Sequence, residues 1–86
     1  MGRKTVYVPL EADLIHHGHV NIIRVAAELG DVIVGLYTDK AISEFGMRSI
    51  LPYDNRKTIA ANIRGVTRVV PQETTDCSEN IIKLKP

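Results

Sequence analysis

An uninterrupted apolar run in the middle of the chain, Val32-Ile33-Val34-Gly35-Leu36-Tyr37, places the strongest constraint on the fold. Polar residues do not alternate with the apolar ones, which is typical of a parallel strand that is covered on both faces. Before the run, at residues 20–29, apolar residues recur with helical spacing, and Gly30 follows in the position that commonly ends a helix. The run is therefore expected to be the central strand of a parallel sheet, entered through an amphipathic helix.

Shorter segments on either side are predicted to pair with this central strand. Residues 5–8 form an apolar strand that Pro9 is expected to end, and residues 66–70 mix charged and apolar side chains, as an edge strand does, before Pro71. The order strand, helix, strand, helices, strand predicts an α/β fold, namely a Rossmann-like βαβαβ half of a doubly wound parallel sheet, with right-handed crossovers and strand order 3-2-1. Residues 1–86 are expected to form a single, truncated domain, because no further strand follows to flank the first.

Further helical segments are predicted after the central strand. Thr38 or Asp39 can cap a short helix that Gly46 ends. A longer helix is predicted over residues 53–64. Its apolar side is expected to consist of Ile59, Ala60 and Ile63. The pattern Asp-Cys-Ser-Glu at residues 76–79 resembles a capping box before a last short helix.

Composition and charge exclude several classes of function. The chain has 11 Lys and Arg against 10 Asp and Glu, a formal net charge of +1, and no basic cluster, which argues against a nucleic-acid partner. Its one cysteine, Cys77, cannot form an internal disulfide and suits a reducing compartment. No apolar stretch approaches the length of a membrane span. We therefore expect a cytoplasmic protein that has neither a membrane nor a nucleic acid as its partner.

The sequence His16-His17-Gly18-His19 lies between the first predicted strand and the first predicted helix. In an open α/β sheet, ligands bind where the strands end and the following helices begin. The N–H groups and the dipole of a helix N-terminus favour an anion there. Gly18 leaves room for a phosphate beside the backbone, and His16 and His19 can add N–H donors from two sides. This pattern predicts a phosphate site without a P-loop.

Two other interpretations of the three imidazoles stay open. Histidine is a common zinc ligand, but the adjacent His16 and His17 point in different directions, and only Asp13 and Cys77 are further candidate ligands. Polar residues at a solvated helix start are the second alternative. The phosphate site is the interpretation that we carry forward, and no metal is expected to be held by these side chains.

Several features around the histidines occur together in one known family. The chain resembles the cytidylyltransferase-like nucleotidyltransferases over residues 5–86, beginning with their H-x-G-H signature at residues 16–19. The other matching segments are Asp13-Leu14-Ile15, Ala26-Ala27-Glu28-Leu29-Gly30-Asp31, Thr38-Asp39, Tyr53-Asp54-Asn55-Arg56-Lys57 and Val69-Val70-Pro71. Residues 12–23 and 38–42 are most similar to the branch that is associated with phosphoenolpyruvate mutase in phosphonate biosynthesis.

The resemblance implies an enzyme that transfers a nucleotidyl group, typically from CTP, to a phosphate or phosphonate acceptor and releases pyrophosphate. Mg²⁺ would accompany the nucleoside triphosphate, and the reaction would depend on positioning and charge stabilisation. By match to the family motif, the catalytic residues would be His16 and His19. The nucleotide would be bound by Leu10, Glu11, Gly18 and Arg56, and the acceptor by Asp13 and Arg48.

The chain departs from the family pattern at three places. Leu10-Glu11-Ala12 stands where many members have Gly-Thr-Phe, so that a carboxylate replaces a hydroxyl. Arg48 is the one cation in a loop that usually offers lysines. Later family motifs, of the Gly-Asp-Asp-Trp and Arg-Thr-x-Gly-Ile-Ser types, would lie beyond Pro86, and the 86-residue chain alone is therefore expected to be inactive.

Self-association and a second class of function follow from the same observations. The helix at residues 20–29 has apolar residues on two sides, with only Asn21, Arg24 and Glu28 as a polar stripe. A half sheet can bury one of those sides well, so a homodimer or a higher oligomer is expected. The alternative to an enzyme is a non-enzymatic phosphate- or nucleotide-binding module that works by self-association or by assembly with another chain.

Overall fold

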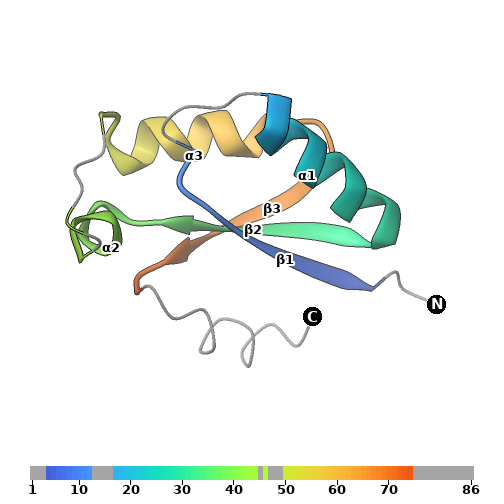
Figure 1. Ribbon diagram of the computed structural model, residues 1–86, viewed down its shortest axis with the longest axis horizontal. Helices are drawn as coiled ribbons and strands as arrows, with labels where there is room; N and C mark the ends of the chain where they lie inside the picture. The colour runs from blue at the N-terminus through green and yellow to red at the C-terminus, as the bar shows by residue number, and fades with distance from the viewer. Residues whose placement is uncertain (1–3, 13–16, 45, 47–49, 75–86) are drawn as a thin grey trace.

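Three parallel strands form the centre of the structure, a computed structural model that describes residues 4–12, 17–44, 46 and 50–74 (Figure 1). The strands are β1 (Thr5–Leu10), β2 (Asp31–Tyr37) and β3 (Val66–Gln72). Because β2 pairs in parallel with both of the others, the order in the sheet is β1-β2-β3. The predicted α/β fold, with the apolar run as its central strand and the order 3-2-1, is confirmed.

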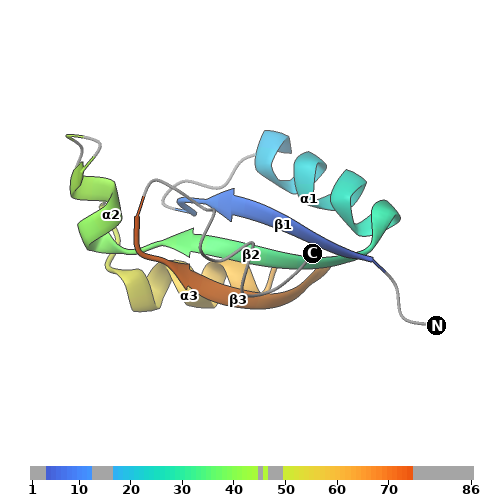
Figure 2. The same ribbon diagram turned by 90° about the horizontal axis from the view of Figure 1, so that it is seen from below.

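Two helices, α1 (His17–Leu29) and α3 (Tyr53–Ala61), cover one face of this sheet, α1 beside β1 and α3 beside β3 (Figure 1 and Figure 2). A third, α2 (Asp39–Glu44), follows β2 at the end of the sheet. The core between the sheet and the two covering helices consists of Leu10, Ala12, Ile23, Ala26, Val32, Val34, Leu36 and Ala60. The helix expected after residue 76 lies outside the described residues.

On the other face of the sheet, the side chain of one tyrosine spans all three strands. Tyr7 of β1 lies over Gly35 of β2, where any side chain would clash with the phenol ring. The hydroxyl of Tyr7 donates a hydrogen bond to Oε1 of Gln72 in β3, and Gln72 is 1% exposed. Gly35 is therefore required for space, because it lets an aromatic side chain cross the central strand.

Both outer strands extend past a proline, so the expectation that Pro9 and Pro71 end them is wrong. β1 continues to Leu10 and β3 to Gln72. Proline has no N–H to donate, but a strand that pairs on one side only can accommodate it where its nitrogen faces away from the neighbour. Both prolines lie on strands that flank β2, and they are therefore compatible with the ladder.

The helix boundaries also differ from the prediction. α1 begins at His17 rather than at residue 20, so that part of the H-x-G-H motif forms its first turn. α3 ends at Ala61 rather than at residue 64. Ile59 is 39% exposed, and its expected place on the apolar side is wrong. Arg56 and Ala60, which are one turn apart, take the inward positions instead.

The glycines after α1 and α2 end those helices for different reasons. Thr38 caps α2, because its Oγ1 accepts a hydrogen bond from the N–H of Ala41 at 3.2 Å, and Gly46 ends it with a φ of +79°. Gly30 does not adopt a positive φ. A side chain at Gly30 would instead clash with the backbone carbonyl of Lys4. The expected conformational role is confirmed for Gly46, whereas Gly30 is needed for space.

Candidate functional site

The candidate site lies at the carboxyl edge of the sheet, where β1 ends and α1 begins. In the first turn of α1, His17 is exposed, while Gly18 and His19 are half-buried. This turn contains no acidic residue, so no carboxylate in it offsets the partial positive charge of the helix N-terminus. The described part of the H-x-G-H motif therefore lies where an anion is favoured.

Ala12 turns the chain between β1 and this helix in a conformation that L-residues rarely adopt. Its φ is +58°, in the left-handed region, and its side chain is 1% exposed and packs in the core. This conformation costs roughly 1–2 kcal/mol for a residue with a Cβ, so the surrounding structure must hold it. The sequence carries no sign of this turn, because alanine has no preference for a positive φ.

Arg56 is the centre of the hydrogen bonding at this edge, and its side chain is 0% exposed. Its Nη1 donates to the carbonyl oxygen of Glu11 at 2.8 Å and to that of Tyr37 at 2.6 Å. Its Nε donates to the carbonyl oxygen of Leu51 at 3.0 Å, and its Nη2 to Oδ1 of Asp39 at 2.6 Å. One side chain thus joins the segments that follow β1 and β2 to the segment that precedes α3.

Asp39 and Tyr53 complete the surroundings of this guanidinium. The carboxylate of Asp39 forms an ion pair with it while remaining 56% exposed. The Cζ atom of Arg56 lies 5.6 Å from the ring centroid of Tyr53, within the range of a cation–π contact. Burial raises the pKa of the Tyr53 phenol above its usual 10.0, and the positive charge of Arg56 opposes this shift. The phenol is therefore a neutral group at physiological pH.

The other expected site residues fall into two groups. Leu10 is 8% exposed and packs in the core, and the carbonyl of Glu11 is held by Arg56, so that both contribute to the shape of this edge. The direct nucleotide contact expected of Arg56 stays a prediction, since the four hydrogen bonds above already use most of its donors. The expected site residues outside the described part of the chain are Asp13, His16 and Arg48.

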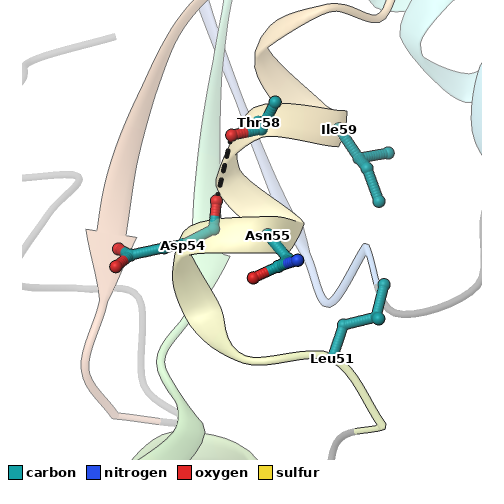
Figure 3. Close-up of a pocket in the computed structure, with 5 residues that line it drawn as sticks. All are labelled: Leu51, Asp54, Asn55, Thr58 and Ile59. Atoms are coloured by element: carbon teal, nitrogen blue, oxygen red, sulfur yellow. Dashed lines mark hydrogen bonds between the residues drawn. The ribbon is translucent and has the colours of Figure 1, made fainter.

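A shallow hollow of about 470 Å³ lies against α3 and the segment before it (Figure 3). It is lined by Leu51, Asp54, Asn55, Thr58 and Ile59. Leu51 and Ile59 flank Asn55, while the carboxylate of Asp54 points away from them and Oγ1 of Thr58 donates to the carbonyl of Asp54 at 3.1 Å. Its lining includes the carboxylate of Asp54 and no cation, which disfavours an anion, and we therefore do not take this hollow as the candidate site.

The described residues contain neither a metal-binding cluster nor a membrane-crossing helix. Within residues 4–12, 17–44, 46 and 50–74, no three His, Cys, Asp or Glu side chains gather where they could hold a metal ion. The zinc alternative depends on His16, which lies outside these ranges, and so it is not tested. In the same part of the chain, no helix combines the length and the apolar character needed to cross a membrane.

Comparisons with known proteins point to one family. Residues 11–86 match the family model described as Cytidylyltransferase-like. Glycerol-3-phosphate cytidylyltransferase of Staphylococcus aureus is 39% identical over 62 residues, which are 71% of this chain and 47% of that protein. Phosphopantetheine adenylyltransferase of Methanopyrus kandleri is 32% identical over 74 residues, which are 85% of this chain and 43% of that protein.

Among solved structures, the lipopolysaccharide core biosynthesis protein from Thermoplasma volcanium has the same fold. It superposes with a TM-score of 0.90 at 22% identity, covering 99% of this chain and 70% of that one. The chain spans about half the length of the curated relatives that it matches. The structural match thus covers the described sheet and both of its covering helices.

Proposed function

Because this chain belongs to the cytidylyltransferase-like family, we propose that it binds a nucleoside triphosphate at the carboxyl edge of its sheet. It would thereby serve as the nucleotide-binding half of an enzyme that transfers the nucleotidyl group to a phosphate or phosphonate acceptor. Its relatives include cytidylyltransferases and an adenylyltransferase, and nucleotidyl transfer is what their names share. The observation that carries the proposal is the first turn of α1, which presents Gly18 and His19 without an acidic residue.

In the proposed reaction, an acceptor oxygen attacks the α-phosphorus in line with the departing pyrophosphate. Negative charge grows on the phosphate oxygens and on the leaving group, and donors aimed at those oxygens lower the barrier. His16 and His19 would supply imidazole N–H groups, and the backbone around Gly18 would supply amide N–H groups. The α1 dipole would add to this stabilisation.

Mg²⁺ is proposed to arrive with the triphosphate. This ion keeps several water ligands and usually takes its other ligands from one or two carboxylates and from substrate phosphates. The described part of the edge fits that mode, because no three His, Cys, Asp or Glu side chains gather there and the carboxylate of Asp39 already pairs with Arg56. The ion would neutralise charge on the phosphates, and positioning is the task of the protein.

CTP is proposed as the nucleotide, and a small phosphate or phosphonate as the acceptor. The cytidylyl group is supported by the names of the glycerol-3-phosphate cytidylyltransferases among the relatives. A phosphonate acceptor rests only on the resemblance of residues 12–23 and 38–42 to the branch associated with phosphoenolpyruvate mutase, and the relatives described above do not belong to that branch. A phosphate ester is supported by the name glycerol-3-phosphate cytidylyltransferase, and the assay below separates the two.

Nucleotide binding and pyrophosphate release test this function in turn. With Mg²⁺ present, CTP is expected to raise the Tm of the chain more than ATP does, because CTP is the proposed nucleotide. A ligand at about 100 times its Kd stabilises the folded state by about 2.7 kcal/mol, and a weaker ligand at the same concentration stabilises it less. Pyrophosphate release by the full-length gene product is then compared between glycerol 3-phosphate and small phosphonates, with a sample lacking acceptor as control. If no nucleoside triphosphate binds at millimolar concentration, the proposed function is wrong.

A non-enzymatic nucleotide- or phosphate-binding module remains the second candidate. The same acid-free helix N-terminus would serve such a module equally well, because anion binding there needs no chemistry. If the full-length gene product binds CTP tightly but releases no pyrophosphate with any acceptor, the module is favoured over the enzyme.

A further inference from the structure

Arg56 bonds to backbone carbonyls that belong to two separate connections. Glu11 follows β1 directly and leads toward the H-x-G-H motif, whereas Tyr37 is the last residue of β2 and leads into α2. Both carbonyl oxygens accept from the same nitrogen, Nη1, at 2.8 Å and 2.6 Å. The position of one nitrogen therefore sets the separation of the two connections.

The fork shape of arginine is what this arrangement needs. Carbonyl groups at the ends of strands must find donors when they are buried. A guanidinium presents N–H groups in a fixed plane and can serve carbonyls on different sides at once, whereas the ammonium of lysine is a compact point charge on a flexible stem. The remaining two contacts, to Leu51 and Asp39, hold that plane in place.

We propose that Arg56 is a positioning residue that fixes the two loops between which the nucleotide binds. This inference rests on the proposed function, but it requires no contact between Arg56 and the nucleotide. The side chain is 0% exposed and acts from beneath the edge of the sheet. It holds the segment in which Ala12 adopts its strained φ of +58°, just before the histidine motif.

The positive charge of Arg56 also favours binding of the proposed triphosphate. It is the one positive charge that is fully buried among the described residues, and its ion-pair partner Asp39 is 56% exposed. Solvent screens an exposed carboxylate more than a buried guanidinium. The edge of the sheet therefore retains part of a positive potential in the place where the proposed triphosphate binds.

Arg56→Lys is the test variant, since it keeps the charge and removes the fork. Arg68→Lys is the matched control, because Arg68 is exposed on β3. In Arg56→Lys, the ¹H–¹⁵N signals of Ala12, Gly18 and Ala41 are expected to broaden by millisecond exchange, while that of Val34 in the core does not. If the competent loop arrangement falls to about a tenth of the population, the apparent Kd for CTP rises about tenfold. The control is expected to bind CTP as the wild type does.

The outcomes separate positioning from mere stabilisation. A folded Arg56→Lys protein with a lowered Tm but with sharp loop signals and an unchanged Kd for CTP would overturn the proposal. If Arg56→Lys does not fold, Asp39→Asn decides in its place: broadened loop signals and weaker binding support positioning, and wild-type values of both contradict it. If the wild type itself binds no nucleotide, the proposed function fails, and the loop signals alone then decide whether Arg56 fixes the two loops.

Discussion

The first turn of α1 assigns different positions to its two described histidines. His17 is exposed and His19 is half-buried. Residues two apart on a helix, as His17 and His19 are, lie on different faces. His17 occupies the variable position of the H-x-G-H motif. It is therefore the natural control for the two residues to which the proposed reaction gives a role.

In the full-length enzyme, His19→Ala is expected to lower turnover by roughly 10²–10³, the effect of losing one donor to a transition-state oxyanion. His16→Ala should give a loss of similar size, and His17→Ala should stay within a few-fold of the wild type. The measurement is the initial rate of pyrophosphate release, made on variants whose circular dichroism matches the wild type. Activity of His19→Ala within a few-fold of the wild type would remove this residue from the mechanism.

Between α1 and β2, the chain turns so closely against the start of β1 that a methyl group has no room. At Gly30 the obstacle is the Lys4 carbonyl, a rigid backbone group. Gly46 after α2 is different, because nothing lies within 4 Å of a Cβ there and only its φ of +79° restricts substitution. Substitution is therefore limited by steric crowding at Gly30 and by backbone conformation at Gly46.

Gly30→Ala is expected to destabilise the fold by about 1–3 kcal/mol, as insertion of an extra methyl group into a packed site does. Gly46→Asn serves as the contrast, because asparagine tolerates a left-handed conformation and should cost little. Urea unfolding of the three proteins gives the comparison. Equal losses at the two positions would show that the Lys4 carbonyl yields easily to a side chain at residue 30.

The elements of this fold could be predicted because each rests on a local pattern. The apolar run of β2 and the capping residue Thr38 are examples, and both are confirmed. The role of Arg56 could not be predicted, because its acceptors lie 45 and 19 residues away in Glu11 and Tyr37. An arginine in the first turn of a helix is ordinarily a surface residue, and no local feature distinguishes one that faces inward.

The molecule as a whole exposes an apolar stripe along the outer side of α1. The stripe consists of Ile22, Val25 and Leu29, which are 57%, 49% and 67% exposed. These residues follow one another at helical spacing and so share one face. A contiguous apolar surface on a small protein commonly marks an interaction site. We propose a second copy as its partner, since a twofold arrangement buries the stripe of both copies.

Leu29→Lys is expected to shift the chain toward the monomer, because it places a charge in the apolar surface that the two copies would bury. Ile50→Lys is the control, as this side chain is 85% exposed and lies outside the stripe. Sedimentation velocity at micromolar concentration measures both variants against the wild type. A wild-type chain that sediments as a monomer throughout this range would contradict the proposed association.

The bond between Tyr7 and Gln72 has a consequence for how the sheet assembles. Its partners are 65 residues apart and lie in strands that do not touch each other. This hydrogen bond can form only when all three strands are in place, with β2 between β1 and β3. A pair of strands alone cannot form it. Such long-range closure slows folding, but it also ties distant segments into one cooperative unit. The outer strands should therefore open to solvent together, in one event, rather than peel away one at a time.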